Sequence, residues 1–334
     1  MATLLFCCGG ECGVGSGSLA PHWTVLGTGS FSTATVRSGA RSLRSNPTAS
    51  TGFFVSSATT TLNVTRHVGR VYIHFATLPS ADTILVGHGS LTDGPVVRFK
   101  QSDSKIYAGV NTTLGASGVS VTTGVWYRID YDFNVNTSGN DTCDVQVDGS
   151  ACGQATATGS SSGNTAIDRL GCQNTCTADV FFDDFVVGST GADYPIGAGY
   201  VNHFIPTSDG THNIAGADDF ERGNTGTDIT NATTTAFQLI DDVPMKTRAS
   251  ATDNIQATAP VNATDYVEVV FGPASGISTP TVGPRVVAAM IAVSQAGTQS
   301  GNHRFALNDN GTTDDISNVT GAGVTTIRYF NKAY

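Results

Sequence analysis

The sequence has little charge and no long apolar run. Charged residues make up 13% of the 334 residues, about half the usual share in soluble domains. Lysine occurs only at positions 100, 105, 246 and 332. The net charge of −10 argues against a basic phosphate-binding surface, so we expect no nucleic-acid partner. No stretch approaches the roughly 18 apolar residues of a membrane span, so we expect none.

The sequence shows no catalytic constellation. The seven histidines are scattered, and HExxH does not occur. Carboxylate pairs such as Asp218–Asp219 lie in polar stretches. The sequence does not place two carboxylates across a cleft, as a glycosidase requires. We therefore predict no catalytic residue and no enzymatic activity, with a glycan-degrading enzyme as an open alternative.

Glycine, serine, threonine and asparagine are abundant instead, with 39 glycines in the chain. Such a surface is typical of extracellular β-proteins. Short segments with period-two alternation recur about every ten residues, as in Gly69–Ala76, where Val71, Ile73 and Phe75 share one face. The expected strands before residue 190 cover 2–6, 30–35, 41–44, 51–57, 69–76, 83–87, 95–101, 105–110, 125–133 and 142–147. This spacing, without a helical period, predicts an all-β sandwich or jelly roll.

The densest hydrophobic run is Asp179–Gly188, which we expect to be the last strand of this sandwich. Period two places Phe181 and Phe185 on one face and Phe182 on the other, as in a strand between two layers. A breaker-rich stretch follows. We therefore predict a sandwich domain over 1–190, a linker over 191–200 and a second, smaller β-rich domain over 201–334. Its expected strands are 235–240, 265–271, 285–293, 303–308 and 325–330, with a short helix as the alternative for 286–293.

Seven cysteines allow several disulfides. Cys143 and Cys152 flank a predicted hairpin and are candidates for a bridge, Cys172 and Cys176 could close a short loop, and Cys12 could pair with Cys7 or Cys8. A zinc site is the competing interpretation, but no CxxC pair or nearby histidine supports it. Disulfides favour an extracellular setting.

Several aromatic residues could form a platform on which a sugar stacks. The candidates are Trp126, Tyr72 and Tyr107, with Trp23 and Tyr127 as further members. The alternative is that these aromatic residues, at alternate positions of a sandwich, belong to its core.

Some segments together resemble the concanavalin A-like (laminin-G-like) jelly roll. They are Gly10–Gly13, Val36–Leu43, Trp126–Asp130, Cys143–Gly149 and Phe182–Val187. The resemblance covers about residues 1–190. The part after the linker, with Phe204–Gly210, Tyr266–Val270 and Val286–Val293, resembles the continuation of this jelly roll in tailed-phage virion proteins.

The resemblance implies a calcium ion that joins the first and last strands through Glu11 and Asp183 or Asp184, since carboxylates suit this cation. The alternative is an exposed turn glutamate and two hydrogen-bonded aspartates.

The resemblance also implies a non-enzymatic structural protein of a tailed-phage particle. This would be a capsid decoration, head fibre or tail-associated protein that adheres to the particle, to surface glycans or to both. The expected partners are the major capsid or other virion proteins, in a homo-oligomer for which a trimer is favoured. Met1–Cys8 lacks the features of a secretory signal, so we expect that either a leader has been removed or the protein reaches a virion or extracellular location without one, for instance by cell lysis. The alternative function is a secreted or cell-surface carbohydrate-binding or filament-forming protein.

Overall fold

The computed structural model describes most of the chain up to residue 201 and shorter parts after it. The described residues are 4–8, 23–39, 41–56, 65–88, 94–136, 139–158, 168–201, 204–214, 220–222, 227–230, 232–239, 255–256, 267–273, 286–294, 302–309, 312–320 and 325–333. Strands dominate these ranges, which contain no α-helix. The predicted all-β class is confirmed.

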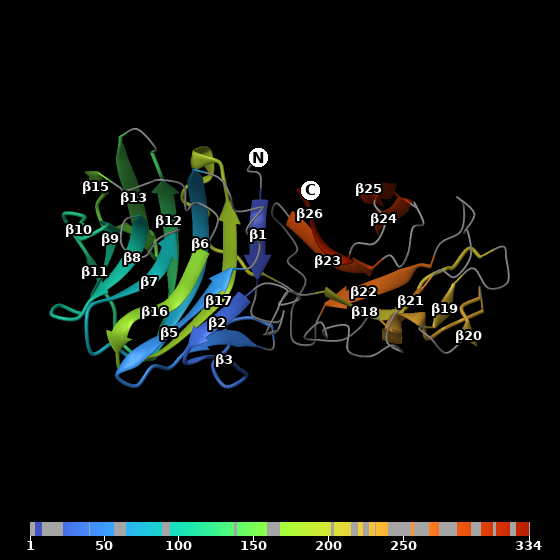
Figure 1. The fold of residues 1–334 in the computed structure, drawn as a ribbon, viewed down its shortest axis with the longest axis horizontal. Helices are drawn as coiled ribbons and strands as arrows, with labels where there is room; N and C mark the ends of the chain where they lie inside the picture. The colour runs from blue at the N-terminus through green and yellow to red at the C-terminus, as the bar shows by residue number, and fades with distance from the viewer. Residues whose placement is uncertain are drawn as a thin grey trace.

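Two antiparallel sheets form a sandwich (Figure 1). Sheet A runs in the order β14-β13-β12-β6-β17-β4-β3, with β1 beside β17 and β15 beside β13. Sheet B runs in the order β10-β9-β8-β7-β16-β5-β2, with β11 beside β9. The strands of sheet A are β1 (Leu4–Cys8), β3 (Gly29–Ser32), β4 (Ser42–Ser45), β6 (Arg66–Thr77), β12 (Trp126–Asn134), β13 (Asn140–Val147), β14 (Ser150–Ala151), β15 (Ala155–Thr158) and β17 (Asp179–Gly188). Those of sheet B are β2 (Trp23–Gly27), β5 (Ser50–Ser56), β7 (Thr83–His88), β8 (Pro95–Lys100), β9 (Lys105–Val110), β10 (Thr113–Leu114), β11 (Val119–Ser120) and β16 (Asp168–Cys176).

The core lies between the two sheets and follows from the alternation of their strands. In β6, Val71, Ile73 and Phe75 are fully buried and point inward, as the period-two pattern predicts. Phe99 of β8 meets Phe75 from the opposite sheet, with ring centroids 5.9 Å apart. Burying large apolar side chains from both layers stabilises the sandwich by about 1.5–3 kcal/mol per side chain.

The last strand, β17, departs from strict alternation at one point. A β-bulge between Asp183 and Val186 interrupts its pairing with β6, and Asp184 takes a positive φ of 52°. As a result both Phe182 and Phe185 point into the core, whereas period two had separated them. Phe181 lies outside this core cluster, on the other face of sheet A.

The sequence predictions missed some strands, including β2 and β16, and misassigned one element. The central strand β16 was missed, because its residues 168–176 are largely polar and lack an alternating apolar pattern. The expected strand over 235–240 is instead a 3₁₀ helix, η3 (Ala236–Leu239). The expected strand over 285–293 is present as β23 (Val286–Ser294), so its helical alternative is excluded.

The described strands after residue 201 pair only with one another. They are β18 (Phe204–Asp209) with β22 (Val269–Pro273); β19 (Glu221–Arg222) with β20 (Thr227–Asp228) and β21 (Ile255–Gln256); β23 with β26 (Thr325–Ala333); and β24 (Asn302–Asp309) with β25 (Thr312–Thr320). Figure 1 shows them to the right of the sandwich. The proposed division at 191–200 stays a prediction. Within the described ranges, no helix is long and apolar enough to span a membrane.

Candidate functional site

The outer face of sheet A contains an unusual row of side chains that crosses four adjacent strands. Trp126 of β12 lies opposite His74 of β6, His74 lies opposite Phe181 of β17, and Phe181 lies opposite Arg44 of β4. The ring centroids are 5.3 Å apart between Trp126 and His74 and 5.9 Å apart between His74 and Phe181. The Arg44 guanidinium carbon lies 5.4 Å from the Phe181 ring centroid. We call these four residues the aromatic row.

The aromatic row has an accessible end and a charged end. Trp126 and His74 are partly exposed, and Phe181 is buried beneath its neighbours. Burial lowers the pKa of His74, although a hydrogen bond to the backbone of Gly124 opposes this shift. The imidazole is therefore mainly neutral near pH 7.

A bidentate ion pair holds the charged end in place. Nε and Nη2 of Arg44 donate to the two carboxylate oxygens of Asp179 at 2.8 and 2.9 Å. The hydrogen bond to Asp179 raises the pKa of Arg44, which outweighs the opposing effect of burial. Both side chains remain partly exposed, with relative accessibilities of 35% and 21%. A fixed, planar pair of this kind presents donors and acceptors in a defined direction.

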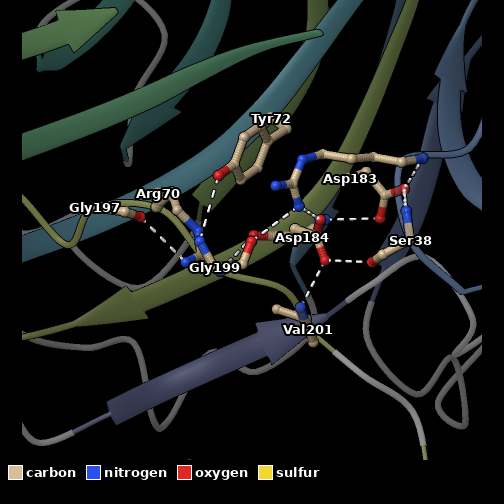
Figure 2. Close-up of polar contacts among 9 residues, drawn as sticks. Ser38, Arg70, Tyr72, Asp183, Asp184, Gly197, Gly199 and Val201 are labelled. Atoms are coloured by element: carbon tan, nitrogen blue, oxygen red, sulfur yellow. Dashed lines mark hydrogen bonds and ion pairs between the residues drawn. The ribbon is translucent and has the colours of Figure 1, made fainter. Parts of the chain in front are cut away.

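A second polar network on the outer face surrounds the β17 bulge (Figure 2). The Asp184 carboxylate is fully buried and contacts the Arg37 guanidinium, and it accepts hydrogen bonds from the Ser38 hydroxyl at 2.6 Å and the Val201 N–H at 2.6 Å. Asp183 accepts backbone N–H groups from Arg37 at 2.9 Å and from Asp184 at 2.7 Å. Because Asp184 occupies a left-handed conformation, its side chain turns toward the residues that follow the sandwich.

Residues 197–201 close over this part of sheet A. The Gly197 N–H donates to Asp130 at 2.8 Å, and Arg37 donates to the Gly199 carbonyl at 2.9 Å. Arg70 lies beneath, 3.3 Å from the Gly197 carbonyl oxygen (Figure 2). The end of the predicted linker is thus hydrogen-bonded to the sandwich and covers the middle of the outer face, and the aromatic row lies beside this covered part.

The structure does not bring the three predicted sugar-stacking residues together. Tyr72 shares the outer face with Trp126, but it is 6% exposed and the Arg37 guanidinium carbon lies 3.3 Å from its ring centroid. Tyr107 lies on β9 of sheet B, where its hydroxyl donates to Asp103 at 2.6 Å. Of the further candidates, Trp23 is buried in the core, and Tyr127 is partly buried and packs against the core. Only Trp126 takes part in the aromatic row.

His74, Phe181 and Arg44 were not named as candidates from the sequence. The alternation of β6 does place His74 on the face opposite Val71 and Ile73. The contacts of Phe181 with His74 and with Arg44 depend on the pairing of β6 with β17 and of β17 with β4. These pairings join residues more than 100 positions apart. No motif in the sequence signals that register.

The predicted calcium site involves Asp183 and Asp184 together with Glu11, which lies outside the described residues. The two aspartates are adjacent and buried. Their oxygens already accept N–H and O–H groups, and Arg37 supplies a positive charge at Asp184. A cation would have to compete with these donors, and calcium binding here stays a prediction.

The predicted disulfides are not formed among the described cysteines. Cys143, Cys152, Cys172 and Cys176 are all buried free thiols. The hairpin register explains the first pair: Cys143 lies opposite Ala155, and the Cys152 N–H bonds to the Val145 carbonyl, so the two cysteines are not cross-strand partners. The thiols of Cys172 and Cys176 are hydrogen-bonded to each other. The side chain of Cys7 and the whole of Cys12 lie outside the described residues, so the pairing of Cys12 with Cys7 or Cys8 stays a prediction.

No protein-family model and no curated protein sequence matches the chain. Solved structures match at low identity. An endo-β-1,4-glucuronan lyase from Trichoderma reesei is 14% identical with a TM-score of 0.40, over 59% of this chain and 100% of the lyase. A xylan-binding domain from Paenibacillus barcinonensis is 13% identical with a TM-score of 0.32, over 56% of this chain and 95% of that domain. A Trypanosoma rangeli sialidase in complex with sialic acid is 13% identical with a TM-score of 0.34, over 48% of this chain and 27% of the sialidase.

These comparisons correct one prediction. The exclusion of enzymatic activity does not stand, because the similar solved structures include a glucuronan lyase and a sialidase, which are enzymes. The sandwich resembles both carbohydrate-binding and carbohydrate-active domains. The tailed-phage resemblance stays a prediction.

Proposed function

We propose that the chain binds a saccharide along the aromatic row of sheet A. The observation that supports this proposal is the ring contact of Trp126, His74 and Phe181 across three strands, next to the paired Arg44 and Asp179. Aromatic faces offer a sugar an apolar surface, and fixed polar groups beside them supply hydrogen bonds to its hydroxyls. The row spans about 14 Å across four strands; its accessible groups are Trp126, His74 and the Arg44–Asp179 pair, with Phe181 buried between them.

The charge of the row favours a neutral saccharide. Arg44 is already paired with Asp179, and His74 is mainly neutral near pH 7. An acidic sugar would therefore meet no free cation among the residues of the row. Its carboxylate would instead have to compete with Asp179 for Arg44.

The test is a titration of the full chain with neutral xylan, cellulose and mannan oligosaccharides, and with alginate and glucuronan oligosaccharides as acidic probes. Calorimetry measures the affinity. We expect Trp126→Ala to weaken binding of the preferred neutral oligosaccharide about tenfold or more, since stacked aromatic residues are typical binding hot spots. The matched control is Tyr107→Ala, which removes an aromatic side chain from the outer face of sheet B and should leave the affinity unchanged.

Binding that survives Trp126→Ala, or is lost equally with Tyr107→Ala, would place the saccharide elsewhere. No binding to any of the oligosaccharides would reject the proposal. The same incubations are assayed for shortened products, which separates binding alone from binding followed by a reaction.

We propose further that this binding takes place on a tailed-phage particle. There the chain would adhere to capsid or other virion proteins as a homo-oligomer, with a trimer favoured. A surface rich in hydroxyl and amide groups, with 13% charged residues, supports an extracellular or virion location. Mass spectrometry of purified particles would detect the chain at a fixed stoichiometry. Its recovery only from culture medium or cell surfaces would favour a secreted or cell-surface carbohydrate-binding protein.

A further inference from the structure

Two histidines and an aspartate meet in the interior of the sandwich. His88 ends β7 and lies directly opposite Asp168, which begins β16, so sheet B contributes both residues. His67 comes from β6 of sheet A. Its Nδ1 lies 2.8 Å from Oδ1 of Asp168, and Nδ1 of His88 lies 3.4 Å from the same oxygen. The two imidazole centroids are 3.8 Å apart.

The cluster is sealed from solvent, and part of its hydrogen-bonding capacity is unused. The side chains of His67, His88 and Asp168 are 0%, 1% and 0% exposed. Nε2 of His88 has no hydrogen-bond partner. The hydroxyl of the fully buried Tyr131, whose pKa is raised by burial and by the charge of Asp168, also has none. An unsatisfied buried imidazole nitrogen is costly, and a bound metal ion would supply a partner that His88 lacks.

The donor set has the chemistry of a transition-metal site. One ligand atom from each of the three residues lies within 4.8 Å of the others, so that modest side-chain rotations could bring all three onto one ion. Imidazole nitrogens with one carboxylate oxygen suit Zn²⁺ and related divalent ions, whereas Ca²⁺ and Mg²⁺ prefer oxygen ligands alone. A tetrahedral ion would take its fourth ligand from water or from a nearby group.

Metal coordination here requires the ionised carboxylate of Asp168 and neutral imidazoles. Coordination through Nδ1 of His67 uses the tautomer with its proton on Nε2.

We propose that His67, His88 and Asp168 bind one divalent transition-metal ion, with Zn²⁺ as the reference case, which joins sheet A to sheet B. The ion replaces the direct contact between His67 and Asp168 with bonds from both sheets to one centre. This role is structural, because the three ligands are buried, and it does not depend on the proposed saccharide binding.

The experiment uses the full chain after treatment with a chelator. Calorimetric titration with Zn²⁺ should show one equivalent bound, and the thermal unfolding midpoint should rise steadily with Zn²⁺ concentration. Asp168→Asn and His88→Gln should each weaken Zn²⁺ binding by roughly a hundredfold or more. The matched control is His212→Gln, because His212 is a buried histidine 3.7 Å from an aspartate oxygen in another part of the chain. It should bind Zn²⁺ like the wild type.

A second measurement keeps the proposal testable if the variants do not fold. The wild-type chain is titrated with Co²⁺, and its absorption spectrum should show a site with nitrogen and oxygen ligands. Thiolate-to-cobalt charge-transfer bands would assign the metal to cysteines and overturn the proposal. It is also overturned if the wild type binds no Zn²⁺, or if folded Asp168→Asn and His88→Gln bind Zn²⁺ as tightly as His212→Gln does.

Discussion

The buried carboxylate of Asp184 accepts a hydrogen bond of 2.6 Å from the backbone N–H of Val201. Asp184 belongs to the last strand of the sandwich, and Val201 lies 17 residues further along the chain. The same carboxylate contacts the Arg37 guanidinium. The Asp184 side chain thus connects two segments to β17: Arg37 in the early part of the sandwich, and Val201 in the segment that follows the sandwich.

We predict that Asp184→Asn destabilises the chain by about 3 kcal/mol, because removing one partner of a buried ion pair leaves the other charge uncompensated. Asparagine tolerates the positive φ of this position, so the substitution isolates the loss of charge. Urea unfolding measures the free energy. Limited proteolysis should also cut near residues 197–201 faster in the variant.

The matched control for Asp184→Asn is Asp103→Asn. Asp103 is exposed and accepts one hydrogen bond from Tyr107. A change of at most about 0.5 kcal/mol is expected for such a surface position. Equal effects of the two substitutions would contradict a special role for Asp184.

Gly69 faces Tyr131 across the β6–β12 pair, and we predict that Gly69→Ala destabilises the chain by about 2 kcal/mol. A Cβ atom there would overlap the Tyr131 ring, which is fully buried and cannot move aside freely. The diagnostic measurement is a double-mutant cycle with Tyr131→Ala. The double variant should be less destabilised than the sum of the single ones. Strict additivity would show that the overlap with Tyr131 is not the cause.

The described cysteines predict a definite thiol count. Four of them are free thiols in the structure, namely Cys143, Cys152, Cys172 and Cys176. Burial raises the pKa of Cys143, and it raises that of Cys152 to about 11, so both react slowly in the folded chain. Alkylation of unreduced protein should therefore modify at least four thiols in guanidinium and few in buffer. Intact mass measures the count, and fewer than four modified thiols in guanidinium would indicate a disulfide among these four cysteines.

The sequence predicts strands well where one face is apolar and the other polar. Residues 69–76 and 125–133 alternate in this way, and the structure places β6 and β12 there. The strand β16 was not predicted because it contains Asp168 and Gln173, which are buried but polar. Polar burial depends on partners from other strands, which the local sequence does not reveal.

The candidate sites depend even more on distant pairing. His67 and Asp168 are separated by 101 residues, and only the packing of sheet A on sheet B brings them together. Trp126 could be named from the sequence because a tryptophan near the start of an alternating strand is conspicuous. Its neighbours in the aromatic row follow from strand register, for which the sequence offers no local signal.

Asp141 gives a prediction about pH. The residue is fully buried at the start of β13, where Oδ1 accepts the Asn136 N–H at 2.9 Å and Oδ2 has no partner. Burial raises the pKa of Asp141, and the hydrogen bond from Asn136 only partly opposes it. In the unfolded chain this carboxyl ionises at its ordinary pKa of about 4.

The raised pKa fixes the sign of the pH dependence. As pH rises above about 4, the unfolded chain loses the Asp141 proton first, while the folded chain still holds it. The wild type must therefore lose stability relative to Asp141→Asn as pH rises, until it passes the folded pKa and the difference levels off. Urea unfolding between pH 3 and pH 7, roughly the range over which carboxyl groups titrate, measures this difference, and the other titrating groups cancel in it. Asn140→Ala, a neighbouring change without a titrating group, should show a constant difference from the wild type. The prediction is contradicted if the difference in unfolding free energy between Asp141→Asn and the wild type also stays constant, or if it changes in favour of the wild type as pH rises. Either result would mean that the Asp141 carboxylate is satisfied in the folded chain.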